Sequence, residues 1–212
     1  MNTCNAVLYP YGSIKPLYFG WRCNMKSYKN WHIPYHKDDI SLYTAHQNLL
    51  SSSHTSGKLP LIIRLMENPC YSLPFITLFH GAISLKYHDY VHILLGRGLL
   101  PKDEAFVIGF TMGATGQTGL IEQNLFAWIS HYCYPSPFNF SVEDLQVYHS
   151  AVQLARTMSV KPLHNFCYEK VIPLPLKKIR LILGINTEQL LQYYQDEAQK
   201  FNYCVESRRL IS

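Results

Sequence analysis

Helical periodicity is the feature of this sequence that most constrains its fold. Between Ser72 and Leu95, apolar side chains recur at steps of three and four residues: Phe75, Ile76, Phe79, Ile83, Tyr87, Val91 and Leu95. This spacing places them on one face of an α-helix. Pro74 suits the first turn of such a helix and Gly96 suits its end. The segment therefore predicts a long amphipathic helix from Ser72 to Leu95.

Segments of the same character occur along most of the remaining chain. They span Leu59 to Met66, Pro101 through Phe110 to the loop "GATGQTG" at 113–119, Leu120 to His131, Ser141 to Met158, Leu174 to Leu183 and Thr187 to Tyr203. Ser141 and Asp144 have the spacing of a helix capping box, and Gly184 suits a helix end. No run alternates long enough to require a sheet, so we expect an all-α fold built as a single multi-helix domain.

The N-terminal quarter of the chain has a different character. Pro10, Pro16 and Pro34 interrupt it, and aromatic residues crowd it. Proline breaks a helix interior, so a long helix is excluded here. The polar run "SSSHTSG" at 51–57 marks a loop. We therefore expect an irregular, aromatic-rich arm over residues 1–57 and a helical domain over residues 58–212.

Composition narrows the classes of partner and compartment. The net charge is +5, and lysines and arginines are scattered without a basic stripe, which indicates that nucleic acid is not the partner. The six cysteines form no Cys-x-x-Cys pair, which suits reduced thiols. The sequence shows neither a signal peptide nor an apolar run long enough to span a bilayer. We expect a cytoplasmic protein, with association to a membrane surface left open.

One mostly apolar stretch, "YHDYVHILLGRGLLPKDEAF" at 87–106, carries several potential metal ligands. His88 and His92 are four residues apart, so their rings project from one helix face, which Asp89 partly shares. Glu104 falls in the first turn of the next helix, which a short loop brings back beside the end of the first. This spacing predicts a metal site of His88, Asp89, His92 and Glu104 on a helical hairpin. An Asp–His hydrogen bond without a metal is the alternative.

The same stretch resembles the signature of the coenzyme Q biosynthesis protein 4 family. The elements that carry the resemblance are His88-Asp89-x-x-His92, eleven residues, Glu104, and the "LLG" that ends at Gly96. Farther on, "YEKVIPLPLKKIRLILGI" at 168–185 resembles a family segment with Tyr-Glu, Pro-Leu, a basic run and Leu-Gly-Ile. The resemblance covers roughly Ser84 to Ile185, whereas the first 70 residues show none.

The resemblance implies a helical metal-binding protein, often dimeric and peripheral to a membrane, that acts in ubiquinone assembly. Its ligand would be a prenylated aromatic acid, a lipid that loses its ring carboxylate oxidatively. Zinc is the usual metal of the family, and two histidines with a carboxylate also suit iron(II). Asp89 would be a ligand or a catalytic group that orients a histidine. Arg97 and Lys102, in the hairpin loop, would bind an anionic part of the substrate.

Two other readings stay open at this point. An HD-type metal phosphohydrolase also centres on a His-Asp pair; it would need a further histidine, His80 or His54, and a distant acid, Asp144. A lipid-binding scaffold without catalysis would use the metal as a structural element or as a clamp for a prenyl phosphate. A coordination sphere closed by protein ligands favours the scaffold, whereas an open position favours catalysis.

Overall fold

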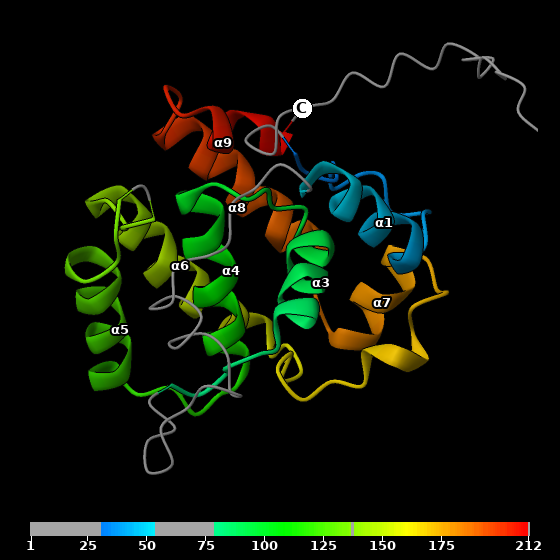
Figure 1. Cartoon of the computed structure of the whole chain (residues 1–212), viewed down its shortest axis with the longest axis horizontal. Helices are drawn as coiled ribbons and strands as arrows, with labels where there is room; N and C mark the ends of the chain where they lie inside the picture. The colour runs from blue at the N-terminus through cyan, green and yellow to red at the C-terminus, as the bar shows by residue number, and fades with distance from the viewer. Residues whose placement is uncertain (1–30, 54–78, 137, 212) are drawn as a thin grey trace, which may run out of the picture.

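The computed structural model describes residues 31–53, 79–136 and 138–211 (Figure 1). These residues form eight α-helices and two short 3-10 helices. The α-helices are α1 (Leu42–Ser53), α3 (Leu85–Leu95), α4 (Pro101–Ala114), α5 (Leu120–Tyr132), α6 (Val142–Met158), α7 (Leu176–Leu183), α8 (Thr187–Lys200) and α9 (Val205–Arg208). The 3-10 helices are η3 (Tyr168–Lys170) and η4 (Arg209–Ile211). No strand occurs within the described ranges, so the all-α prediction is confirmed.

Helix α4 is the central element, and its residues are buried along almost its whole length. It packs against α6 on one side and lies beside α3 on the other (Figure 1). A Cβ atom on Gly109 would lie 2.4 Å from the Tyr148 carbonyl oxygen, and one on Gly113 would lie 2.4 Å from that of Val152. The two helices therefore approach so closely that only glycine fits at these positions.

Two apolar clusters surround α4. The larger one joins α1, α3, α4, α6, α7 and α8 and includes the buried side chains of Leu42, Leu95, Phe106, Ile179 and Tyr194. The smaller one lies between α4, α5 and α6 and is centred on Phe126 and Tyr148. Among the described residues, α5 lies at one edge, with α4 and α6 on its inner side (Figure 1). None of the helices in the described ranges combines the length and apolar character needed to cross a bilayer.

Part of the predicted N-terminal arm belongs to the core. Trp31, Ile33 and Tyr35 are buried, and the residues that follow form α1, which packs on α3. Arg180 fixes this segment: its guanidinium stacks over the Tyr35 ring at 3.7 Å and donates to the carbonyl oxygens of Tyr35 and Leu94. The irregular conformation expected for residues 1–57 thus does not extend to Leu42–Ser53. The boundary at residue 57 lies outside the described residues.

The long helix expected from Ser72 to Leu95 is shorter than predicted. Residues 79–84 are not helical, and α3 begins only at Leu85, after the extended N-cap residue Ser84. Gly81 has a φ of 97°, which is incompatible with a right-handed helix. The backbone N–H of His80 donates to the Glu122 carboxylate instead of continuing a helix. Residues 72–78 and the short helix expected at 59–66 lie outside the described residues.

The other helices begin and end close to the expected positions. The capping box is present: Asp144 N–H donates to the Ser141 hydroxyl at 3.2 Å, and Ser141 N–H donates to the Asp144 carboxylate at 2.8 Å. Gly96 and Gly184 end α3 and α7 with φ values of 66° and 78°. α4 runs through Phe110 to Ala114, two residues into the segment 113–119 expected to be a loop, and it packs against α6 along this length.

Candidate metal centre

The turn between α3 and α4 brings the end of one helix beside the start of the next. Gly96 takes up a left-handed conformation, and the chain re-enters a helix at Pro101. The N-cap residue Leu100 donates its backbone N–H to the Asp103 carboxylate at 3.1 Å, which fixes the first turn of α4. Glu104 follows in that same turn and therefore faces the histidine-bearing side of α3.

Three side chains converge at this point. The Nε2 atom of His88 lies 2.9 Å from Oε2 of Glu104 and 3.0 Å from Nε2 of His92, and His92 Nε2 lies 3.3 Å from the same oxygen. The three ligand atoms thus form a nearly equilateral triangle. A proton on Nε2 of either histidine can form a good hydrogen bond to only one of the other two atoms of the triangle. Hydrogen bonds alone therefore do not satisfy all three contacts.

The dimensions of this triangle suit a single metal ion. Ligand atoms held about 2.0–2.2 Å from one tetrahedral or octahedral ion lie roughly 2.9–3.5 Å from one another. The three separations fall in that range, and the group fits a metal by its composition as well. Two imidazoles and one carboxylate suit zinc and also iron(II). Three protein ligands leave a further position for water or substrate, as in catalytic zinc sites.

Burial makes the cluster costly unless its charges are paired. His92 is 0% exposed, His88 is buried, and the Glu104 side chain is 30% exposed. Burial alone would raise the pKa of the Glu104 carboxyl, but the charges and hydrogen bonds of His92 and His88 outweigh it and hold that pKa well below its usual range. The carboxylate is therefore ionised, which is the form that binds a metal.

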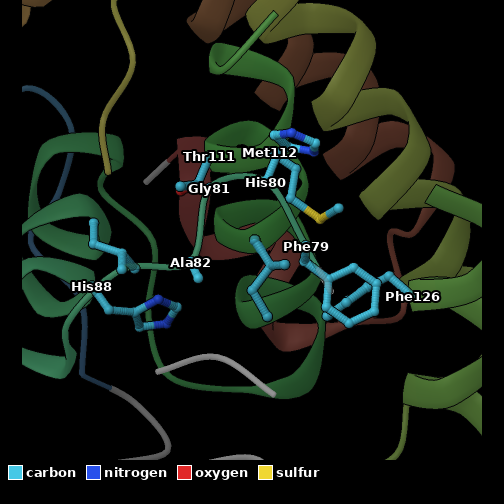
Figure 2. A pocket seen from close by; sticks show the side chains of 10 residues that line it. Phe79, His80, Gly81, Ala82, His88, Thr111, Met112 and Phe126 are labelled. Carbon is cyan, nitrogen blue, oxygen red and sulfur yellow. The ribbon is translucent and has the colours of Figure 1, made fainter. Parts of the chain in front are cut away.

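A small apolar pocket adjoins the cluster on the His88 side. Figure 2 shows His88 reaching it from one side and Phe126 lying on the other. The remaining lining residues come from the turn before α3 and from α4: Phe79, His80, Gly81, Ala82, Ile83, Ile108, Thr111 and Met112. A ligand in this pocket would lie beside a metal-binding residue while its apolar part contacts aliphatic and aromatic side chains.

Asp89 lies next to the cluster without belonging to it. Its Oδ2 atom is 3.7 Å from Nε2 of His46, a residue of α1, and the group of convergent ligand atoms contains His88, His92 and Glu104 only. Burial raises the pKa of Asp89, and the charges of the nearby histidines oppose this rise. The structure thus places Asp89 within the electrostatic environment of the site, paired with a histidine that the sequence pattern did not single out.

Arg97 is in a different environment from the one expected for a substrate-binding residue. It is 0% exposed and forms two parallel bonds to Glu197 of α8, at 2.9 Å and 2.6 Å. Its guanidinium lies 3.8 Å from the centre of the Phe106 ring and 4.5 Å from that of Tyr194. This arrangement ties the α3–α4 turn to α8 and engages both terminal nitrogens of the guanidinium. Arg97 therefore holds the turn that positions Glu104.

Lys102 is also buried and makes intramolecular contacts. Its Nζ atom lies 3.1 Å from Glu143, 3.3 Å from the sulfur of Cys204 and 4.1 Å from the centre of the Phe201 ring. These contacts join α4 to α6 and to the end of α8. The predicted roles of Arg97 and Lys102 in binding an anionic substrate are not supported by this geometry.

Three residues that anchor the site lie far from it in the sequence. His46 contacts Asp89, Glu197 pairs with Arg97, and Arg209 of η4 pairs with Asp103 in the first turn of α4. No local pattern signals such partners, because each depends on how distant helices pack. The only signal in the sequence is a charged residue within an otherwise apolar segment. Such a residue indicates that a partner of opposite charge exists, because a buried charge requires one, but it does not identify that partner.

The residues needed for a phosphohydrolase site have other partners. His80 Nδ1 lies 2.9 Å from Oε2 of Glu122, and Asp144 caps α6. His54 lies outside the described residues. The structure thus does not gather His80 and Asp144 with His88 in the cluster.

The fold and the site together define an all-α protein with a candidate three-residue metal centre. Comparisons with models of known protein families, with curated proteins and with solved structures found no match. The resemblance to the coenzyme Q biosynthesis protein 4 family therefore depends on the sequence motifs alone.

Proposed function

We propose that this protein binds one divalent metal ion, zinc or iron(II), through His88, His92 and Glu104. The observation that carries the proposal is the triangle of their ligand atoms, with sides of 2.9, 3.0 and 3.3 Å. Without a cation, the two imidazole nitrogens and the carboxylate oxygen have too few protons between them to form a hydrogen bond along each side of the triangle, and burial makes this costly. A cation satisfies all three at once.

The ligand we propose is an aromatic acid with a prenyl chain, a precursor of a quinone. The pocket beside His88 supports this class, because its walls are apolar and two of its lining residues are the phenylalanines Phe79 and Phe126. A bound metal would supply a Lewis acid that attracts the carboxylate or phenolate oxygen of such a ligand. The protein's own part is to hold the ring in an apolar environment beside that position.

Asp89 remains our candidate for a catalytic group. Its carboxylate lies outside the ligand triangle but within the field of the two histidines. Nε2 of His46, on α1, lies 3.7 Å from it. In this position Asp89 acts by orienting the site and by adding negative charge beside it.

Contact with a lipid surface is part of the same proposal. The outer face of α5 carries exposed large apolar side chains, and we call this group the α5 stripe: Ile121, Leu125, Trp128 and Tyr132. They recur at steps of three and four, so they share one face of the helix. No charged residue belongs to the stripe, and tryptophan and tyrosine favour the membrane–water interface. Homodimerisation, which the resemblance also implies, remains a prediction.

Analysis of co-purified lipid tests the proposed ligand. We expect mass spectrometry of an organic extract to detect a prenylated aromatic acid in the wild-type protein, expressed in a host that makes isoprenoid quinones. Ala82→Phe would fill the pocket while leaving His88, His92 and Glu104 in place, so the lipid should be lost and the metal retained. Equal lipid in wild type and variant, or phosphate release from nucleotides by the metal-loaded protein, would contradict the proposal.

A further inference from the structure

A second histidine, His80, lines the pocket that adjoins the metal centre, and it is paired with Glu122. His80 and Glu122 come from different elements, the turn before α3 and the first turn of α5. The backbone N–H of His80 and its ring atom Nδ1 both contact the Glu122 carboxylate, the latter at 2.9 Å. Glu122 therefore fixes both the backbone and the ring orientation of His80.

This arrangement determines which ring nitrogen is available. Because Nδ1 faces the carboxylate, it carries the proton, and Nε2 of a neutral ring is then an acceptor. The His80 side chain is 52% exposed, and within the described ranges its Nε2 atom has no hydrogen-bond partner. An imidazole oriented by a carboxylate with its other nitrogen accessible is a common way to prepare a group for hydrogen bonding or proton transfer.

His80 shares a pocket with His88, one of the proposed metal ligands. His80 and His88 line the same pocket, and Figure 2 shows them on different sides of it. Most other lining residues are apolar, and the hydroxyl of Thr111 already donates to the Val107 carbonyl oxygen at 2.8 Å. A ligand that reaches the metal through one polar group would meet His80 with a second polar group.

We propose that His80, oriented by Glu122, is a ligand-binding residue of this pocket and accepts a hydrogen bond from the ligand that the metal holds. This inference rests on the proposed function, because it requires a metal at His88, His92 and Glu104. It adds a specificity: the ligand must carry a hydrogen-bond donor, such as a ring hydroxyl, at a distance from its metal-binding group. A ligand without that donor would leave the imidazole nitrogen unpaired.

Two substitutions of His80 separate binding from structure. In His80→Asn the side-chain amide takes the place of Nδ1, so it can still donate to Glu122, but nothing replaces Nε2. In His80→Gln the amide reaches the position of Nε2 and can still accept a hydrogen bond. If His80 only supports the structure through Glu122, the Asn variant should resemble wild type more closely than the Gln variant. If His80 binds the ligand through Nε2, the Gln variant should resemble wild type more closely.

The experiment compares two probes, 4-hydroxybenzoate and benzoate, by calorimetric titration of the zinc-loaded proteins. We expect wild type to prefer 4-hydroxybenzoate by about tenfold, the value of one good hydrogen bond. His80→Asn should abolish the preference and His80→Gln should retain part of it, with one zinc ion per chain in all three proteins. An unchanged preference in His80→Asn at full zinc content would overturn this inference alone. Wild type that binds no zinc would overturn the proposed function, and the inference with it.

Discussion

Oε2 of Glu104 lies 2.9 Å from Nε2 of His88, although the two residues are 16 positions apart and belong to different helices. The turn between α3 and α4 creates this proximity. Arg97 in the turn pairs with Glu197 of α8, and Asp103 in the first turn of α4 pairs with Arg209 of η4. The geometry of the site thus depends on packing across the whole domain.

The two acids near the histidines should differ in their effect on metal affinity. Glu104→Gln removes a ligand atom, so we expect zinc affinity to fall by at least about tenfold. Asp89→Asn removes only a neighbouring charge and should weaken zinc binding less. Competition with a chromophoric chelator measures both affinities. A larger loss in Asp89→Asn than in Glu104→Gln would show that Asp89 is itself a metal ligand, as the sequence pattern predicts.

Arg97 should matter for stability. Arg97→Met leaves the Glu197 carboxylate buried without its partner, so we expect the free energy of unfolding to fall by about 3–5 kcal/mol. The double variant Arg97→Met/Glu197→Met removes both charges and should be less destabilised than the single variant. Urea denaturation provides the comparison. A single variant as stable as wild type would refute the buried ion pair.

Gly109 tests the close approach of α4 and α6. Alanine favours a helix over glycine by about 1 kcal/mol, so Gly109→Ala would stabilise an unconstrained helix. Because the new Cβ atom would lie 2.4 Å from the Tyr148 carbonyl oxygen, we expect a net loss of about 2 kcal/mol instead. Gly119→Ala is the matched control, since nothing lies within 4 Å of a Cβ atom there. Thermal unfolding that shows Gly109→Ala to be more stable than wild type would contradict the packing.

The contact between Tyr87 and Glu169 predicts a pH dependence of stability. The Tyr87 hydroxyl donates to Glu169, and this hydrogen bond lowers the pKa of that carboxyl and raises the pKa of Tyr87 to about 12. A carboxyl whose pKa is lowered by folding stabilises the fold above its unfolded pKa, and this contribution is lost as the pH falls through the folded pKa. The stability difference between wild type and Tyr87→Phe should therefore shrink below about pH 4. Denaturation curves at pH 3 to 7 measure it, and a pH-independent difference would exclude the linkage.

The α5 stripe should determine binding to lipid. Ile121→Ser/Trp128→Ser removes two exposed apolar side chains, so we expect binding to vesicles of phosphatidylcholine and phosphatidylglycerol to fall by at least about tenfold. Leu181→Ser is the control, because Leu181 is 80% exposed, close to the 86% of Ile121, but lies on α7. Co-sedimentation with the vesicles measures the bound fraction. Equal losses in both variants would show that α5 has no special role.

Much of the fold is predictable because it depends on local rules. Apolar residues at helical spacing, the capping box at Ser141 and the glycines after α3 and α7 identify helices that the structure contains. The convergence of His88, His92 and Glu104 follows from a helix period and a short turn. These signals act within a few residues of one another, so sequence alone reveals them.

The structure differs from the sequence-based predictions where contacts between residues far apart in the chain determine the conformation. Gly81 lies within the stretch whose apolar residues have helical spacing. Its positive φ excludes a right-handed helix at this position, and α3 begins only at Leu85. Arg97 resembles an exposed loop residue in the sequence, and only the packing of α8 shows that Glu197, 100 positions away, buries and pairs it. Asp89 lies beside His46 of α1, and this proximity also depends on how the helices pack. Tertiary contacts of this kind leave no local signature.

The metal content of the purified protein tests the central claim most directly. Plasma mass spectrometry should find one zinc or iron ion per chain in wild type, and less than about a tenth of that in His88→Ala/His92→Ala, because two of three ligands are gone. The Asp144→Asn variant, altered at a helix cap away from the cluster, should keep the wild-type content. Full metal content in the double histidine variant, or none in wild type after incubation with zinc, would contradict the account.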